Sequence, residues 1–314
     1  MQKKKITGRE AFIEYYRPLF DSDETFEKFL TSLEAETFPI LRFPKKNEAK
    51  LKKLWKKEKL PWEVLSWYPY ALKWPQGVGK GTTLPGSELY YVQNASSLLP
   101  VLALDPQPGE CVLDACAAPG GKALFIAELM KGEGEFVAND LSGVRAARMK
   151  KIFAAYGVEE FVNVHHWNAM SFSRSHPLGF DKILLDAPCS SEKHVFNSPK
   201  HIRDWKSGRI KHLKKRQWTM LKSLWKALAP GGVLVYSTCA VTPDENELLI
   251  NKFVQRVEKA VPNSIEVLPL SPDLPHEKGR VHPHKYPNMD PMFVAIFRKT
   301  KEEELSPSSK ISSN

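Results

Sequence analysis

The chain has 314 residues, enough for one large domain or for one large and one small domain. Hydrophobic residues make up 42% and charged residues 26%, as in a soluble globular protein, and no apolar run is long enough to span a bilayer. Lysine and arginine number 46 against 36 aspartates and glutamates, a formal net charge of +10. This excess suits a polyanion such as RNA, but it also describes an ordinary basic protein.

The N-terminal residues are not expected to form a secretion signal. Residues 1–5 are basic, but no apolar segment follows them, so we expect a cytoplasmic protein that is not secreted. An organelle-targeting peptide stays open, although Glu10 and Glu14 argue against one. Residues 301–314 have the polar composition of a disordered tail.

Residues 1–85 predict a small α+β domain that faces RNA. Apolar residues at helical spacing occupy residues 26–33, a short strand is expected at 39–43, and a lysine-rich helix at 47–59. That helix and the two residues before it could contact phosphates through eight lysines: Lys45, Lys46, Lys50, Lys52, Lys53, Lys56, Lys57 and Lys59. An aromatic run follows and could stack on unpaired bases, but packing in a core is favoured for its members: Trp62, Trp67, Tyr68, Tyr70 and Trp74.

Residues 86–300 predict an α/β domain with a doubly wound, Rossmann-like, mostly parallel sheet. Short apolar runs alternate with helical patterns, which places helices on both faces of the sheet. Strands are expected at 111–115, 135–140, 162–166, 181–186, 233–237 and 292–297. Helices are expected at 95–104, in a segment that runs through Leu129, at 142–156 and at 210–228, the last ended by the Pro-Gly-Gly at 230–232.

A glycine-containing loop after the first of these strands is the candidate cofactor site. It consists of Cys116, Ala117, Ala118, Pro119, Gly120, Gly121 and Lys122. Small residues there let a cofactor approach the backbone N–H groups, and Asp140 at the end of the next strand can accept hydrogen bonds from ribose hydroxyls. The pattern also fits an NAD-type oxidoreductase, although it lacks GxGxxG spacing. Residues 77–82 look like a phosphate loop, but no buried strand precedes them.

Two cysteines follow two other strands, Cys189 in Asp-Ala-Pro-Cys and Cys239 in Ser-Thr-Cys. Because the carboxyl ends of parallel strands share one edge, both thiols are expected beside the glycine loop. A thiolate that adds to carbon 6 of cytosine makes carbon 5 nucleophilic enough to take a methyl group, and an acid such as Asp186 would stabilise the adduct. The chain has four cysteines and no CxxC pair, so neither a zinc site nor a disulfide framework is predicted.

Over residues 89–299 the sequence resembles the Sun (NSUN-type) family of RNA cytosine-C5 methyltransferases. The resemblance lies in YYVQNASSLLP, DACAAPGGK, NDLSGVR, LLDAPCSS, the RQ of KKRQWTML, APGGVLVYSTC and PDENE. It implies that S-adenosylmethionine is the cofactor, that Cys239 is the nucleophile and that Cys189 helps to release the product. It further implies that residues 116–122, Asp140, Arg145 and Asp186 contact the cofactor, with Lys122 also near the reacting base.

Two positions depart from the family pattern. Asn168 stands where the family often has aspartate, and its amide oxygen can still accept a hydrogen bond from the adenine amine. Residues 290–293 stand where a more glycine-rich turn is common.

The substrate is expected to be unpaired or flipped RNA, because carbon 5 is inaccessible in a stacked helix. Residues 190–217 are predicted to fold over it, with Trp205 and nine basic residues: Lys193, Lys200, Arg203, Lys206, Arg209, Lys211, Lys214, Lys215 and Arg216. A solvated charged helix face is an equally good interpretation of 211–215. His282 and His284 lack further ligands at useful spacing, so they are expected to be surface residues, and no metal is predicted.

Three alternatives stay open beside an RNA methyltransferase that acts as a monomer. An NAD-type oxidoreductase would leave both cysteines unexplained. A catalytically silent RNA-binding assembly factor would keep only the fold, and DNA as the substrate is the weakest alternative. Since no appended RNA-binding module is visible, the short N-terminal region must help to choose the target; tRNA is slightly favoured over rRNA.

Overall fold

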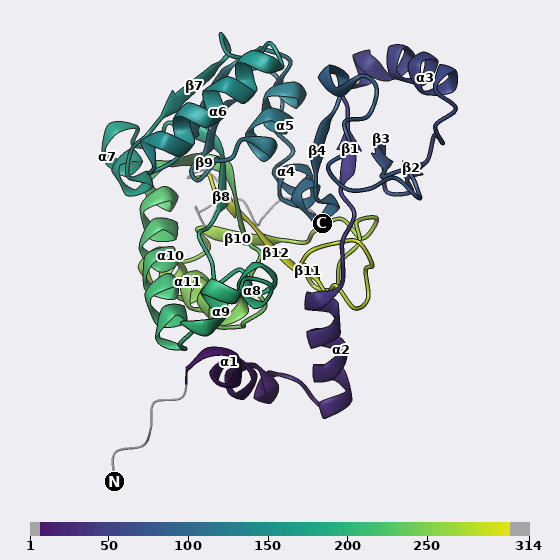
Figure 1. Ribbon diagram of the computed structural model, residues 1–314. Helices are drawn as coiled ribbons and strands as arrows, with labels where there is room; N and C mark the ends of the chain where they lie inside the picture. Colours follow the sequence, from purple (N-terminus) through teal and green to yellow (C-terminus); the bar gives the residue numbers. More distant parts are fainter. Residues whose placement is uncertain (1–6, 302–314) are drawn as a thin grey trace, which may run out of the picture.

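Two β-sheets organise residues 7–301, the part of the chain that the computed structural model describes (Figure 1). The larger sheet has the order β10-β12-β9-β8-β5-β6-β7, and β11 pairs with β12. Its strands are β5 (Cys111–Asp114), β6 (Glu135–Asn139), β7 (Val162–His165), β8 (Phe180–Asp186), β9 (Leu228–Thr238), β10 (Ile265–Leu268), β11 (Arg280–Val281) and β12 (Met292–Lys299).

The centre of this sheet is parallel and one edge is antiparallel. Strands β5 to β9 pair in parallel, whereas β12 runs antiparallel to both β9 and β10. The predicted doubly wound, mostly parallel α/β sheet is therefore confirmed, and the strand β10 is an addition that the sequence analysis did not anticipate.

Helices cover both faces of the larger sheet. Successive side chains of a strand point to opposite faces, so a run of apolar residues gives the sheet two apolar faces that helices can bury. On β5, Val112 packs with α4, α5 and α6, whereas Leu113 packs with α7, α10 and α11. The helices are α4 (Leu99–Leu104), α5 (Gly121–Met130), α6 (Gly143–Ala155), α7 (Phe172–Ser175), α8 (Glu192–Phe196), α9 (Pro199–Arg203), α10 (Gly208–Ala227) and α11 (Glu247–Ala260). The 3₁₀ turns η4 (Ala95–Leu98) and η5 (Ala169–Ser171) precede α4 and α7.

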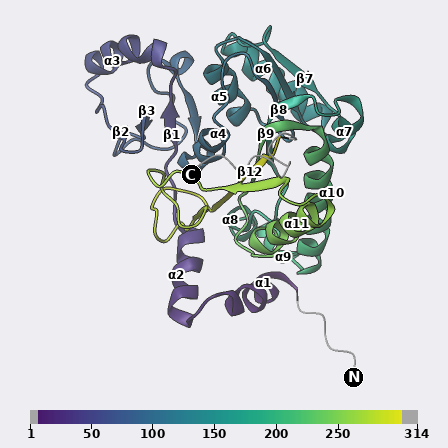
Figure 2. The same cartoon turned by 180° about the vertical axis from the view of Figure 1, so that it is seen from behind.

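The smaller sheet has the order β2-β3-β1-β4 and lies beside α4 and α5 in both views (Figures 1 and 2). Its strands are β1 (Ile40–Arg42), β2 (Val64–Leu65), β3 (Tyr68–Lys73) and β4 (Tyr91–Gln93), so it extends beyond residue 85. The lysine-rich segment forms η2 (Lys45–Asn47) and α3 (Glu48–Lys57), and η3 (Ser87–Leu89) precedes β4. The aromatic run packs in the cores of this region, as favoured from the sequence; Trp74 is buried.

A buried ion pair joins the smaller sheet to helix α5. Arg42 on β1 is fully buried and contacts the carboxylate of Glu128 on α5, whose side chain is 14% exposed. The Arg42 guanidinium also lies over the rings of Phe125 and Tyr91, 4.6 and 5.9 Å from their centroids. The small sheet is thereby fixed against the helix that follows the candidate cofactor loop.

The first two helices pack on another part of the chain. Helices α1 (Gly8–Tyr16) and α2 (Asp23–Glu34), linked by η1 (Arg17–Leu19), form a core with α8 and with Trp205 and Ile210. Trp205 is only 3% exposed and lies 5.4 Å from the Phe12 ring. Within the segment predicted to fold over the RNA, the Trp205 ring is therefore not available to a base, because it packs against α1.

Several predicted boundaries shift by a few residues. The expected helix at 210–228 is α10, which ends at Ala227. Strand β9 begins at Leu228 and includes Pro230-Gly231-Gly232, whereas the sequence predicted a strand that starts only after these three residues. The expected helix at 95–104 divides into η4 and α4. Residues 77–82 form turns without a following helix, so the resemblance to a phosphate loop has no structural counterpart.

Candidate functional site

A cavity of about 570 Å³ lies at the carboxyl ends of β5, β6, β8 and β9. It brings together most of the predicted site residues: Cys116, Ala118, Lys122, Asp140, Arg145, Asn168, Asp186, Cys189 and Cys239. Ala117, Pro119, Gly120 and Gly121 do not line it and instead shape the turn into α5. Ligands bind at this edge of doubly wound sheets because several strand ends and helix N-termini converge there.

Two glycines are required at the start of α5. Gly120 has a φ of +119°, which L side chains rarely adopt, and a Cβ there would lie 3.1 Å from Met149. A Cβ on Gly121 would lie 2.7 Å from the ring of Tyr91 on β4. The loop can therefore turn tightly beneath the cavity only without side chains at these positions, and the small sheet supplies part of the constraint.

Asp140 is held at the end of β6 by two donors. Its carboxylate accepts the Ser142 N–H at 2.9 Å and pairs with the Arg145 guanidinium at 3.0 Å. Arg145 also donates to the carbonyl of Ala118 at 2.6 Å, so it joins the acid to the glycine loop. On another wall of the cavity, the side-chain oxygen of Asn168 accepts the Met170 N–H at 3.1 Å. This bond uses one lone pair of the oxygen and leaves the other for the expected hydrogen bond from the adenine amine.

Asp186 and Lys122 form an ion pair of 2.8 Å. The second Asp186 oxygen accepts a hydrogen bond from the Ser237 hydroxyl at 2.8 Å, so the carboxylate has a fixed orientation. Burial lowers the pKa of Lys122, but the charge of Asp186 outweighs burial and the pKa lies above its usual value. Lys122 is therefore a cation in this site, and Asp186 has its counter-charge.

Asp114, at the end of β5, is a third acid to which the sequence analysis gave no role. It is buried, and one oxygen accepts the Cys116 N–H at 3.3 Å. Burial, together with the charge of Asp186, raises the pKa of Asp114 to about 8, so this carboxyl is protonated at neutral pH. It can therefore donate a hydrogen bond beside the cavity without adding a negative charge.

The two predicted thiols are in contact: the sulfur atoms of Cys189 and Cys239 lie 3.0 Å apart. The hydroxyl of Ser191 lies 3.2 Å from the Cys239 sulfur and 3.5 Å from that of Cys189. The hydrogen bond to Cys239 and burial raise the pKa of Cys189 well above its usual range, so Cys189 stays a neutral thiol. A neutral thiol can donate a hydrogen bond to the neighbouring sulfur of Cys239.

A buried glutamate ties together the two loops that carry these thiols. Glu192 is 1% exposed, and burial raises its pKa. One carboxyl oxygen accepts the hydroxyls of Tyr16 and Ser190, at 2.5 Å each, and the other accepts the Val241 N–H at 3.1 Å. Helix α1 is thus connected to the segments that follow both cysteines, a role that no sequence pattern indicated.

A second buried glutamate, Glu245, lies in the same region and is fully buried. It accepts the Ser190 N–H at 3.1 Å and the Gln217 amide N–H at 2.6 Å. Glu245 belongs to the PDENE motif, Gln217 to RQ and Ser190 to LLDAPCSS. The sequence therefore contained the signal, but a motif by itself does not say which loops its side chains will bridge.

The predicted RNA-facing segment is only partly free to bind phosphates. Lys193 pairs with Asp290 at 3.1 Å, and Lys214 pairs with Asp244. Arg216 lines the cavity, is exposed, and has no ion pair or hydrogen bond within residues 7–301. Five other exposed basic residues of the segment 190–217 likewise have no ion-pair partner among the described residues: Lys200, Lys206, Arg209, Lys211 and Lys215.

His282 and His284 are half-buried and line a second cavity, so they lie in a recess of the surface. Among the described residues, no group of three or more His, Cys, Asp or Glu side chains is arranged to hold a metal ion. Within the same range, no helix combines the length and apolar character that crossing a bilayer requires.

Comparison with known proteins gives matches to RNA methyltransferases. A family model described as 16S rRNA methyltransferase RsmB/F matches residues 101–298. The 26S rRNA (cytosine-C(5))-methyltransferase nsun-1 of Caenorhabditis elegans is 38% identical over 232 residues, 69% of this chain and 34% of that protein. Ribosomal RNA small subunit methyltransferase F of Enterobacter sp. (strain 638) is 37% identical over 234 residues, 71% of this chain and 48% of that protein. The chain thus spans half or less of the length of these relatives.

A solved structure agrees with the fold. The methyltransferase homolog protein from Pyrococcus horikoshii is 27% identical, with a TM-score of 0.71 over 92% of this chain and 99% of that chain.

Proposed function

Since the chain belongs to the 16S rRNA methyltransferase RsmB/F family, we propose that it transfers a methyl group from S-adenosylmethionine to carbon 5 of a cytosine in RNA. The family membership confirms the resemblance that the sequence motifs predicted. The observation that carries the proposed reaction is the pair of contacting thiols, Cys189 and Cys239, beside the Lys122–Asp186 ion pair in one cavity.

The cavity fits the proposed cofactor in size and in chemistry. Its volume of about 570 Å³ lies within the range of small-molecule sites. Asp140 is fixed where a carboxylate accepts ribose hydroxyls, and Cys116, Ala118 and Asn168 form neighbouring walls. S-adenosylmethionine, when bound, supplies an electrophilic methyl group on a sulfonium. The residues around it have the tasks of holding it and of excluding water.

Cys239 is the proposed nucleophile. Its thiolate adds to carbon 6 of cytosine, and the new S–C6 bond makes carbon 5 electron-rich enough to take the methyl group. Asp186, oriented by Lys122 and Ser237, would face the N3 and exocyclic amine of the base and stabilise the adduct. A base then removes the proton from carbon 5, the S–C6 bond breaks, and Cys239 leaves as a thiolate.

Cys189 is assigned to product release because it remains a neutral thiol against the Cys239 sulfur. In that position it can donate to the sulfur of Cys239 as this sulfur leaves carbon 6. Loss of Cys189 would therefore leave addition and methyl transfer possible and slow only the last step.

For the substrate we favour ribosomal RNA, because both relatives described above are named for it. The tRNA favoured from the sequence remains the second candidate. Arg216, at the cavity rim and without a protein partner among the described residues, is proposed to contact a phosphate of the target nucleotide. The domain assignment is also retained as a proposal: a small RNA-facing N-terminal unit and a methyltransferase unit.

Bisulfite mapping of rRNA and tRNA from cells with and without the gene identifies the cytosine and the RNA class. With that RNA, Cys189→Ala is expected to accumulate a covalent protein–RNA adduct, whereas Cys239→Ala forms none. Cys111→Ala is the matched control, since Cys111 lies outside the cavity and should retain turnover. An adduct formed by Cys239→Ala would reverse the two roles, and no gene-dependent methylcytosine would refute the proposed function.

A further inference from the structure

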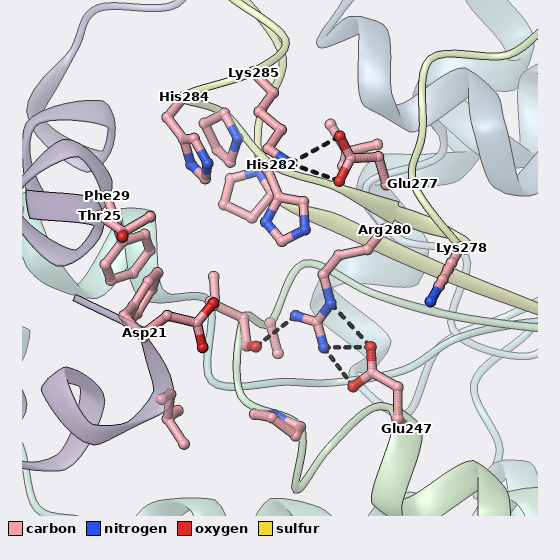
Figure 3. A pocket seen from close by; sticks show the side chains of 18 residues that line it. Asp21, Thr25, Phe29, Glu247, Glu277, Lys278, Arg280, His282, His284 and Lys285 are labelled. Atoms are coloured by element: carbon pink, nitrogen blue, oxygen red, sulfur yellow. Dashed lines mark hydrogen bonds and ion pairs between the residues drawn. The ribbon is translucent and has the colours of Figure 1, made fainter.

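A second cavity, of about 830 Å³, lies directly beyond the nucleophile loop (Figure 3). Ala240 and Val241, which follow Cys239, form part of its wall, and Pro291 lines both cavities. Helix α2 forms the opposite wall, and the segment around β11 closes the third side. A group bound here would therefore lie beside the proposed reaction centre.

Two of the three cations that line this cavity are already engaged. Arg280 pairs with both oxygens of Glu247 and donates to the Val241 carbonyl at 2.6 Å, and Lys285 pairs with Glu277 at 2.7 Å (Figure 3). Lys278 has no ion-pair partner within residues 7–301, but the three cations of the lining are balanced by three carboxylates, those of Asp21, Glu247 and Glu277. The cavity is therefore a poor phosphate site, although it lies next to one expected to receive RNA.

The groups that remain available suit a nucleobase. Burial, with the charge of Arg280, lowers the pKa of His282 to about 4, so its ring is a neutral donor and acceptor. Neither nitrogen of that ring has a hydrogen-bond partner within residues 7–301. Asp21 points into the cavity from the opposite side and likewise has no partner in that range (Figure 3). His284, which is also half-buried, adds a second imidazole ring.

Flipping a cytosine out of an RNA strand deprives its neighbours of a stacking partner. Proteins that read single-stranded RNA compensate by stacking unpaired bases on aromatic and imidazole rings. A free carboxylate such as Asp21 can accept a hydrogen bond from the N–H donors on the exposed edge of an unpaired base. The cavity offers both a ring for stacking and a carboxylate for hydrogen bonding, and its wall includes Ala240 and Val241, the two residues that follow Cys239.

We propose that this cavity binds the unpaired base of the nucleotide next to the target cytosine. The inference rests on the proposed function, because it requires an RNA strand that enters beside Cys239. It assigns His282 and Asp21 to recognition of sequence context and gives them no part in the chemistry.

The test uses a short RNA around the cytosine that bisulfite mapping identifies. In two further RNAs the base on the 5′ or the 3′ side of that cytosine is replaced by an abasic ribose. The wild-type protein is expected to lose about tenfold in kcat/KM on one of the abasic RNAs, mainly through KM. His282→Ala should lose a similar factor on the intact RNA and little more on that abasic RNA, since both changes remove the same contact.

Two further variants keep this test decisive. His176→Ala, a histidine outside the cavity, should retain wild-type kinetics on every RNA. Asp21→Asn, on an exposed side chain that does not threaten folding, should repeat the His282→Ala result if the latter variant is unstable. Full activity on both abasic RNAs, or losses that multiply in the variants, would overturn the inference. No methyl transfer by the wild type would instead refute the proposed function.

Discussion

Replacing the buried Glu245 by glutamine tests whether the Glu245 carboxyl, which lies between the two loops that carry the cysteines, changes its protonation near neutral pH. One Glu245 oxygen accepts from Ser190 and Gln217, and the other has no hydrogen-bond partner among the described residues. Burial, with the neighbouring charge of Glu192, raises the pKa of Glu245 to about 7. A glutamine amide oxygen can keep both existing hydrogen bonds, so Glu245→Gln removes the ionisation and little else.

The sign and size of the effect follow from proton linkage. The folded state holds the proton of Glu245 more tightly than the unfolded state, in which the pKa is near 4.5. The free energy of unfolding therefore falls as pH rises from 4.5 to about 7, by about 3 kcal/mol at 1.4 kcal/mol per pH unit. The glutamine variant lacks this loss. Relative to wild type it should gain roughly 2 to 3 kcal/mol between pH 5 and pH 8.

Urea unfolding of both proteins at pH 5, 6, 7 and 8 measures this difference. Glu159→Gln, on an exposed side chain, controls for the removal of one carboxylate and should change the free energy of unfolding by less than about 0.5 kcal/mol. A wild-type-to-variant difference that stays constant with pH, or that grows in favour of wild type at high pH, would refute the reasoning.

Three other variants test separate parts of the structure. Arg42→Ala leaves the carboxylate of Glu128 buried without a counter-charge, so urea unfolding should record a loss of about 3–5 kcal/mol; a loss under 1 kcal/mol would contradict the interface role. Arg216→Ala should weaken RNA binding about fivefold and reduce the slope of log K against log salt by about one in filter binding, whereas an unchanged slope would exclude a phosphate contact. Gly121→Ala brings a Cβ within 2.7 Å of the Tyr91 ring and should cost about 1–3 kcal/mol in thermal unfolding, a cost that an unaltered Tm would disprove.

The sequence predicted the strands at 111–115, 135–140 and 181–186 because their apolar runs match the pattern of buried parallel strands. Once those strands were expected to be parallel, Asp140, Cys189 and Cys239 had to meet at one edge, and the cavity contains all three. Local periodicity and chain direction therefore determined the fold class and most of the candidate site.

Only the tertiary structure decided which distant segments support that site. Tyr16 and Glu192 are 176 residues apart in sequence, and their hydrogen bond depends on how α1 packs over Trp205. The same packing removed Trp205 from the expected RNA surface and placed α2 opposite His282. A local sequence pattern specifies the face that a residue presents within its own element. The burial of a carboxylate, and hence its pKa, depends on which other elements close over that face, and this is set by packing between residues far apart in the chain.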